Sequence, residues 1–100
     1  MLFSDLQKLL IDAKIEGNLN KKKLKYITDH SKDANCNTLL VIDTRKNFKK
    51  IYLKKAIING LNTIITNAYL ENCPITQIIV KDLNKNVFKL LKFRQAFKPL

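Results

Sequence analysis

The sequence predicts an α/β fold with a small, mostly parallel sheet and flanking helices. Three short runs rich in valine and isoleucine, residues 38–43, 62–66 and 76–82, predict strands. A basic segment with helical periodicity, residues 48–59, lies between the first two runs. Because the runs are apolar almost without interruption, they suit strands that are buried on both faces, as parallel strands are. Strand, helix, strand is the order of a Rossmann-like βαβ unit, and we expect the rest of the chain to pack around it.

The composition indicates one globular domain. The chain has 100 residues, of which 46% are hydrophobic and 27% are charged, and both values are ordinary for a folded domain. No apolar run approaches the roughly 18 residues that a membrane-spanning helix needs. The N-terminus reaches Asp5 and Lys8 too early for a signal peptide. We therefore predict a cytoplasmic protein without a membrane span.

The net charge of +11 raises the question of a nucleic-acid partner. Lysine supplies 17 of the 19 basic residues, and the chain also has 11 asparagines and 12 isoleucines, which share A/T-rich codons with lysine. Nucleic-acid sites prefer arginine for bidentate contacts and aromatic rings for stacking, and both are scarce here. We expect most of the charge to form a solvated surface, and a basic nucleic-acid-binding module stays as an alternative.

The segments that flank the βαβ unit predict further elements. Before it we expect, in order, a helix capped by Ser4 or Asp5 that ends near Ala13, an extended piece at 15–18, a solvated lysine run at 21–23, a half-buried strand at 24–28 and a polar loop at 29–37. After it we expect a loop at 68–74, a last helix capped by Asn84 that buries Val87, Phe88, Leu91 and Phe97, and a stop at 98–100.

The helix at 48–59 has one apolar side and one basic side. Phe48, Tyr52 and Ala56 are expected to face the sheet, and Lys46, Lys50 and Lys54 to form a solvated stripe. Asn47 is the expected N-cap, and Gly60 is expected to end the helix with a positive φ.

The sequence does not predict a self-sufficient active site. Gly17 and Gly60 are the only glycines, which excludes a P-loop and a dinucleotide-binding fingerprint. The single histidine, His30, lies between Asp29 and Ser31, and three consecutive side chains do not form a catalytic triad. Cys36 and Cys73 have no metal-binding spacing, and we expect reduced thiols, with a disulfide or a metal site as alternatives. We predict no catalytic residues and no metal ligands.

A ligand site is expected in the loop at 44–47. In open α/β sheets, ligands bind beside the carboxyl ends of parallel strands, and this polar loop follows the central strand.

The order of several short motifs resembles the N-terminal domain of the Mur ligases, most closely the MurE type. The motifs are Ile15-x-Gly17-Asn18, Ile27-Thr28-x-x-Ser31-Lys32, Leu39-Leu40-Val41, Ala56-Ile57-x-x-Gly60 and Thr63-Ile64-Ile65. The resemblance covers almost the whole chain. It implies a domain that anchors the UDP-linked muramoyl-peptide substrate of a peptidoglycan-biosynthesis ligase. The ATPase and C-terminal domains of the family have no counterpart here, so this chain alone is expected to need no cofactor; ATP and Mg²⁺ would bind the missing central domain.

The resemblance also implies which residues bind UDP. Ser31 matches the serine of the family's Asp-Ser-Arg motif, Lys32 replaces its arginine and His30 replaces its aspartate. Arg45 can bind the pyrophosphate bidentately, and Lys46 can act as a point charge. The predicted UDP site is therefore Thr28, His30, Ser31, Lys32, Thr44, Arg45, Lys46 and Asn47.

Three partners follow from this interpretation or compete with it. The first is the UDP-sugar-peptide, together with the remaining ligase domains if the chain is a fragment. Nucleic acid is the second, and the scarcity of arginine and aromatic residues argues against it. The third is a protein partner of a degenerate, non-enzymatic interaction or scaffold domain. Independently of the partner, the alternative to a UDP role for Ser31 and Lys32 is that they only cap and solvate a loop.

Overall fold

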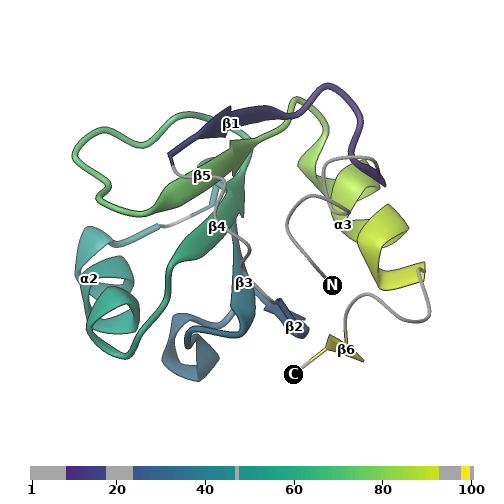
Figure 1. The fold of residues 1–100 in the computed structure, drawn as a ribbon. Coiled ribbons are helices and arrows are strands. Elements are labelled where there is room, and N and C mark those ends of the chain that lie inside the picture. Colours follow the sequence, from purple (N-terminus) through teal and green to yellow (C-terminus); the bar gives the residue numbers. More distant parts are fainter. Residues whose placement is uncertain (1–8, 18–23, 47, 93–97, 100) are drawn as a thin grey trace.

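In the part of the chain that the structure describes, six strands form one sheet in the order β1-β5-β4-β3-β2-β6 (Figure 1). The computed structural model describes residues 9–17, 24–46, 48–92 and 98–99. The strands are β1 (Lys14–Glu16), β2 (Tyr26–Thr28), β3 (Thr38–Ile42), β4 (Thr63–Thr66), β5 (Thr76–Ile79) and the two-residue β6 (Lys98–Pro99). All neighbouring pairs are parallel except β1 and β5, which are antiparallel. The predicted α/β fold with a mostly parallel sheet is confirmed.

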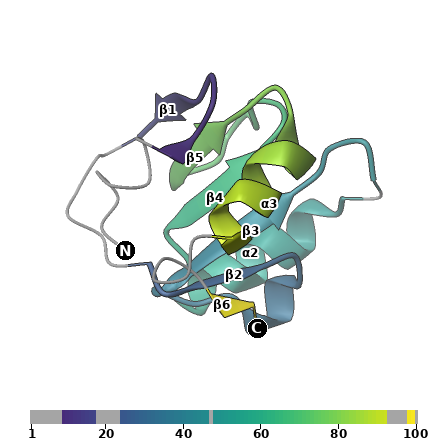
Figure 2. The same ribbon diagram turned by 90° about the vertical axis from the view of Figure 1, so that its right-hand side faces the viewer.

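Helices cover both faces of the sheet. Helix α2 (Lys50–Ile58) and the 3₁₀ turn η1 (Ser31–Asp33) lie on one face, and α3 (Leu83–Lys92) lies on the other. Figure 2 shows α3 in front of the sheet and α2 behind it. None of the helices in the described ranges is long and apolar enough to cross a membrane.

Two apolar clusters, one on each face, hold these layers together. Successive side chains of a strand point to opposite faces, so Leu39 joins the cluster under α3 while Leu40 joins the cluster under α2. Ile64 and Ile65 of β4 divide between the clusters in the same way. The continuous apolar runs in the sequence therefore correspond to strands that are covered on both faces, as predicted.

The start of α2 lies two residues later than its pattern suggested. Lys49 is the N-cap, and Asn47, the predicted cap, lies outside the described residues. Phe48 precedes the helix, so its spacing to Tyr52 is not a helical spacing. The side chains that face the sheet are Leu53 and Ala56, whereas Tyr52 is 49% exposed, so its predicted burial was wrong. Gly60 ends the helix with a φ of 105°, as expected.

Helix α3 is also shifted from the prediction. Its first residue is Leu83, and the side chain of Asp82 caps it by accepting a hydrogen bond from the Lys85 N–H (3.0 Å), so the prediction of Asn84 as the cap was wrong. Leu83, Asn86 and Leu90 are buried instead of Phe88 and Leu91, which are 60% and 41% exposed. A polar residue on the buried side hid the true periodicity. Val87 is half-buried against the core, and Phe97 lies outside the described residues.

The polar residue on the buried side of α3 is Asn86, and its side chain binds the N-terminal segment. Its Oδ1 accepts a hydrogen bond from the Ile11 N–H (2.8 Å), and its Nδ2 donates to the Asp82 carbonyl (2.8 Å). The predicted first helix does not extend to Ala13, because residues 10–13 are not helical and Asp12 has a φ of 55°. The predicted caps Ser4 and Asp5 and the lysine run 21–23 lie outside the described residues.

The other strand and loop predictions are mostly confirmed. The extended piece is β1, and Gly17 follows it with a φ of 122°. Strand β2 is more deeply buried than predicted, since Ile27 and Thr28 on opposite faces are both buried. The predicted loop at 29–37 contains the 3₁₀ turn η1. The loop at 68–74 is present, and the thiols of Cys36 and Cys73 are free, as expected.

Candidate functional site

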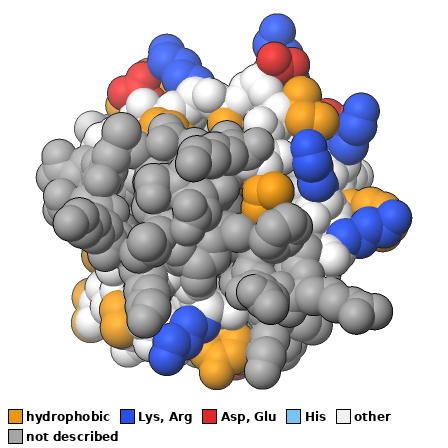
Figure 3. Space-filling view, turned by 45° about the vertical axis from the view of Figure 1, so that its right-hand side comes forward, with side chains coloured by type: hydrophobic (Ala, Val, Ile, Leu, Met, Phe, Trp, Pro, Cys, Tyr) orange, Lys and Arg blue, Asp and Glu red, His pale blue; other side chains and the backbone are white. Residues whose placement is uncertain are grey.

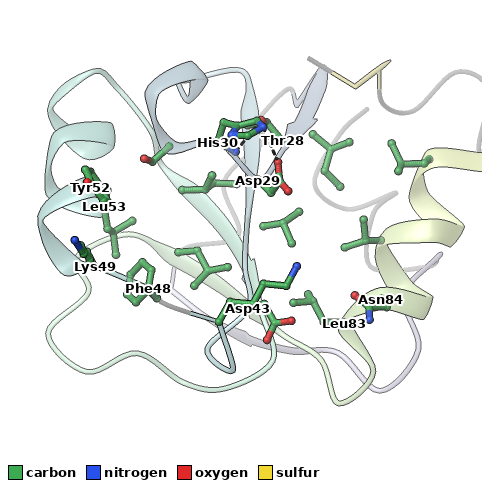
Figure 4. Close-up of a pocket in the computed structure, with 18 of the residues that line it drawn as sticks. Thr28, Asp29, His30, Asp43, Phe48, Lys49, Tyr52, Leu53, Leu83 and Asn84 are labelled. Atoms are coloured by element: carbon green, nitrogen blue, oxygen red, sulfur yellow. Dashed lines mark hydrogen bonds and ion pairs between the residues drawn. The ribbon is translucent and has the colours of Figure 1, made fainter.

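A cleft of about 650 Å³ opens where β2 and β3 end. Because these two strands pair in parallel, their carboxyl ends lie at the same edge of the sheet. The lining comes from the end of β2 and the start of η1, the end of β3, the start of α2, and one side of α3. Figure 4 shows the cleft with α2 on one side and α3 on the other. The position is the one that α/β sheets use for ligands.

The loop after β2 places Ser31 at the cleft. The Thr28 hydroxyl oxygen accepts a hydrogen bond from the His30 N–H (3.0 Å), which turns the chain away from the strand. The Nε2 atom of His30 lies 3.4 Å from Oδ1 of Asp29, and both side chains are largely exposed. Ser31 then begins η1, whose turn closes with a hydrogen bond from the Ala34 N–H to the Ser31 carbonyl (3.2 Å). A half-buried serine is thereby fixed on the cleft wall.

The loop after β3 is held by a bidentate ion pair. The Arg45 guanidinium donates from Nε to Asp43 Oδ1 and from Nη2 to Asp43 Oδ2, both at 2.9 Å. These bonds lower the pKa of Asp43 to about 2 and raise the pKa of Arg45. The fork of Arg45 is therefore already occupied by a carboxylate of its own loop.

Asn67, in the loop after β4, ties the same segment to the next strand. Its Nδ2 donates to Asp43 Oδ1 (3.2 Å), and its Oδ1 accepts from both the N–H and the hydroxyl of Thr44 (2.9 and 2.8 Å). The Thr44 hydroxyl is thus engaged within the protein. The segment that leads from β3 toward α2 is anchored on both sides.

Cations and rings line the side of the cleft next to α2. Lys46 and Lys49 are exposed, and no ion pair within the described ranges includes either of them. Phe48 and Tyr52 lie beside them. On the opposite side, α3 contributes the ring of Phe88, which carries the Lys92 ammonium 4.6 Å from its centroid.

The structure brings some of the predicted site residues together and separates others. Thr28, His30, Ser31 and Lys46 line the cleft. Lys32, Thr44 and Arg45 are exposed and do not line it, and Asn47 lies outside the described residues.

Sequence reasoning missed several residues of the cleft: Asp29, Asp43, Phe48, Lys49, Tyr52, Asn84 and Phe88. Phe48, Lys49 and Tyr52 follow directly after the loop at 44–47, where we expected a ligand at the carboxyl end of a parallel strand. Including the next helical turn in that expectation would have found them. The residues of α3 carry no comparable signal, because they come from a distant part of the chain.

The charges of the cleft favour an anionic ligand. Arg45 pairs with Asp43, and among the other charged side chains of the lining the two lysines, Lys46 and Lys49, outnumber the one carboxylate, Asp29. In the described part of the chain, no three His, Cys, Asp or Glu side chains cluster as metal ligands would. The cleft therefore offers a serine hydroxyl, two ammonium groups and apolar rings.

A comparison of the chain with models of known protein families and with curated proteins finds no match.

Proposed function

We propose that this chain is a substrate-anchoring domain that binds a UDP-linked sugar-peptide, as its resemblance to the N-terminal domain of Mur ligases implies. The observation that carries the proposal is the cleft at the carboxyl ends of β2 and β3. The cleft contains Ser31, to which the resemblance to the family's Asp-Ser-Arg motif assigns UDP binding, together with Lys46 from the loop after β3. These two residues are 15 positions apart in the sequence and converge only in the fold.

The lysines and the rings suit the two chemical parts of a nucleoside diphosphate. Lys46 and Lys49 are point charges that can approach phosphate oxygens from several directions, and the Ser31 hydroxyl can donate a hydrogen bond. Phe48 and Tyr52 supply flat apolar surface against which a uracil ring can stack. Arg45 would have to release Asp43 before it could bind pyrophosphate, so Lys46 takes the role that we had assigned to Arg45.

The domain binds its ligand without transforming it. In the family that the chain resembles, ATP and Mg²⁺ belong to a separate central domain. An assay for ATP-dependent amide-bond formation should therefore give no product with this chain alone, and product formation would contradict the proposal.

The proposal is tested by titrating the protein with UDP and with UDP-N-acetylmuramic acid, followed by NMR at low and at moderate salt. We expect saturable shifts at Ser31, Lys46 and Lys49 that persist at moderate salt. Lys46→Ala should weaken binding about tenfold, since it removes one charged hydrogen-bond donor. Ser31→Ala should weaken it less. Lys54→Ala is the matched control, because Lys54 is exposed on α2 and does not line the cleft.

The same titration separates the alternatives. A nucleic-acid-binding module should ignore UDP and bind DNA or RNA with an affinity that falls steeply with salt. The lysines of α2 and its N-cap, which have no acidic residue near them in the sequence between positions 44 and 70, are the observation in its favour. A scaffold domain should respond to neither ligand. Either result would overturn the UDP-binding proposal.

A further inference from the structure

The outward side of α2 combines exposed isoleucines with lysines. Ile51 and Ile58 are 56% and 84% exposed, and they are separated by seven residues, which is about two helical turns. Lys54 and Lys55 lie between them and are also exposed. At about 100° per residue, these four positions lie opposite Leu53 and Ala56, which face the sheet. We call Ile51, Lys54, Lys55 and Ile58 the outer face of α2.

This face has no acidic neighbour in the sequence, and the acidic residue of the adjacent turn η1, Asp33, forms no ion pair with it. Residues 44–70 contain no Asp or Glu, whereas Lys49, Lys50, Lys54 and Lys55 fall within seven positions of one another. None of the ion pairs formed within the described ranges involves these four lysines. Figure 3 is turned toward α3 and away from α2, and there too lysine and arginine side chains are scattered over the edges of the surface. The positive potential around α2 is therefore available to an external anionic surface.

The two isoleucines are unusual residues for a solvated helix face. Isoleucine is among the residues that are most often buried, and its β-branched side chain is a poorer helix former than lysine or alanine. The A/T-rich codons that isoleucine shares with lysine account for its abundance in the chain, but not for the placement of both exposed isoleucines of α2 on one face, flanked by lysines. An apolar phase outside the protein would account for this placement.

We propose that the outer face of α2 docks on a membrane surface that contains anionic phospholipid. The helix lies parallel to the bilayer, the lysines contact headgroup phosphates, and Ile51 and Ile58 enter the boundary between headgroups and acyl chains. Nucleic acid would satisfy the lysines but would leave the isoleucines without an apolar partner. A flat bilayer also accommodates the convex surface of a helix. This proposal is independent of the ligand that occupies the cleft.

The test is sedimentation with vesicles of phosphatidylcholine and with vesicles that contain 30% phosphatidylglycerol, at low salt. The full chain should sediment with the anionic vesicles and not with the neutral ones. Replacing two lysines, in Lys54→Ser with Lys55→Ser, should weaken binding roughly thirtyfold, at about a factor of five per lysine near the surface. Ile51→Ser with Ile58→Ser should weaken it about tenfold, since both side chains stay in water.

Two matched controls separate a specific face from general charge and general hydrophobicity. Lys85→Ser with Lys89→Ser removes the same charge from exposed positions on α3, and Tyr69→Ser removes a 58% exposed ring from a loop. Both should bind anionic vesicles nearly as well as the parent protein. Circular dichroism should show that every variant is folded, because all the positions are exposed. Equal losses in the controls, no loss in the α2 variants, or no sedimentation of the parent protein would overturn the proposal.

Discussion

The two helices beside the cleft are anchored in different ways. Helix α3 begins with a side-chain cap from Asp82 and buries Asn86, whose amide makes hydrogen bonds to two backbone groups. Helix α2 begins at Lys49 with no side-chain cap bond within the described residues, and it faces the sheet with Leu53 and Ala56. Both helices pack on the sheet through apolar side chains, and α3 adds polar bonds that cap its own start and bind the N-terminal segment at Ile11. The difference leaves the polar groups of α2 uncommitted, and both functional proposals use them.

The largest expected effect tests the packing that the two helices share. Leu90→Ala on α3 should lower the free energy of unfolding by about 3–5 kcal/mol and Leu53→Ala on α2 by about 2–3 kcal/mol. Leu90 is fully buried and Leu53 is 7% exposed, so the second cavity is more open to collapse or to water. Urea unfolding measures both values. A loss below about 1 kcal/mol for Leu53→Ala would show that apolar packing is not what fixes α2.

A second substitution tests the polar bond that only α3 has. Asn86→Ala leaves the Ile11 N–H without its acceptor and should cost about 1–3 kcal/mol. Asn84→Ala is the matched control on the same helix, because Asn84 is exposed and should change stability little. Equal effects of the two substitutions in urea unfolding would mean that the buried amide does not stabilise the fold.

The helix caps provide a smaller and reciprocal test. Asp82→Ala removes the cap of α3 and should cost about 1 kcal/mol, while Lys49→Ser adds a cap to α2 and should gain about 0.5–1 kcal/mol. Asp82→Ser should restore most of the loss, because serine also caps helices. If thermal unfolding showed that Lys49→Ser destabilises the protein, the start of α2 would depend on more than packing.

The smallest expected effect concerns the segment that leads into α2. Arg45 lowers the pKa of Asp43 from 3.8 to about 2, so this carboxylate stabilises the fold when it is ionised. The contribution is complete above about pH 4, and it is lost as the pH falls through about 2. Between these values, the stability of the parent protein should fall more than that of Asp43→Asn, which carries no titrating group there. Parallel acid titrations of the two proteins should diverge at low pH and show no such divergence between pH 5 and 7.

Strands were predictable from the sequence, while helix orientation was not. In runs such as Thr38–Ile42, the four residues after Thr38 are all apolar, and a short run of this kind suits a strand that is covered on both faces. The buried side of α3 was not recognisable, because Asn86 interrupts the apolar stripe that Leu83 and Leu90 form. Phe88 is two positions from the buried Leu90, which is about 200° around the helix, and it is therefore exposed. A buried asparagine cannot be recognised before its backbone partner is known.

The candidate site was predictable only for residues that lie close in sequence to a predicted strand end. The carboxyl end of β3 indicates the region of Lys46, because parallel strands present ligands at that edge. The occupied fork of Arg45 was not apparent, since the residue composition of a loop does not show which charges pair within it. The contribution of α3 depends on a contact between distant segments, which no local pattern indicates.

The antiparallel strand β1 has a consequence for the behaviour of the protein in concentrated solution. It ends one side of the sheet with only three residues, and Lys14 and Glu16 form an ion pair of 3.4 Å there. Directly after it, Gly17 approaches β5 so closely that a Cβ would lie 2.8 Å from the Thr76 Cα. A short, charged border of this kind is a poor template for a strand from another molecule. This edge of the sheet therefore resists edge-to-edge aggregation. A longer β1, or replacement of its charged side chains by neutral ones, would remove that protection.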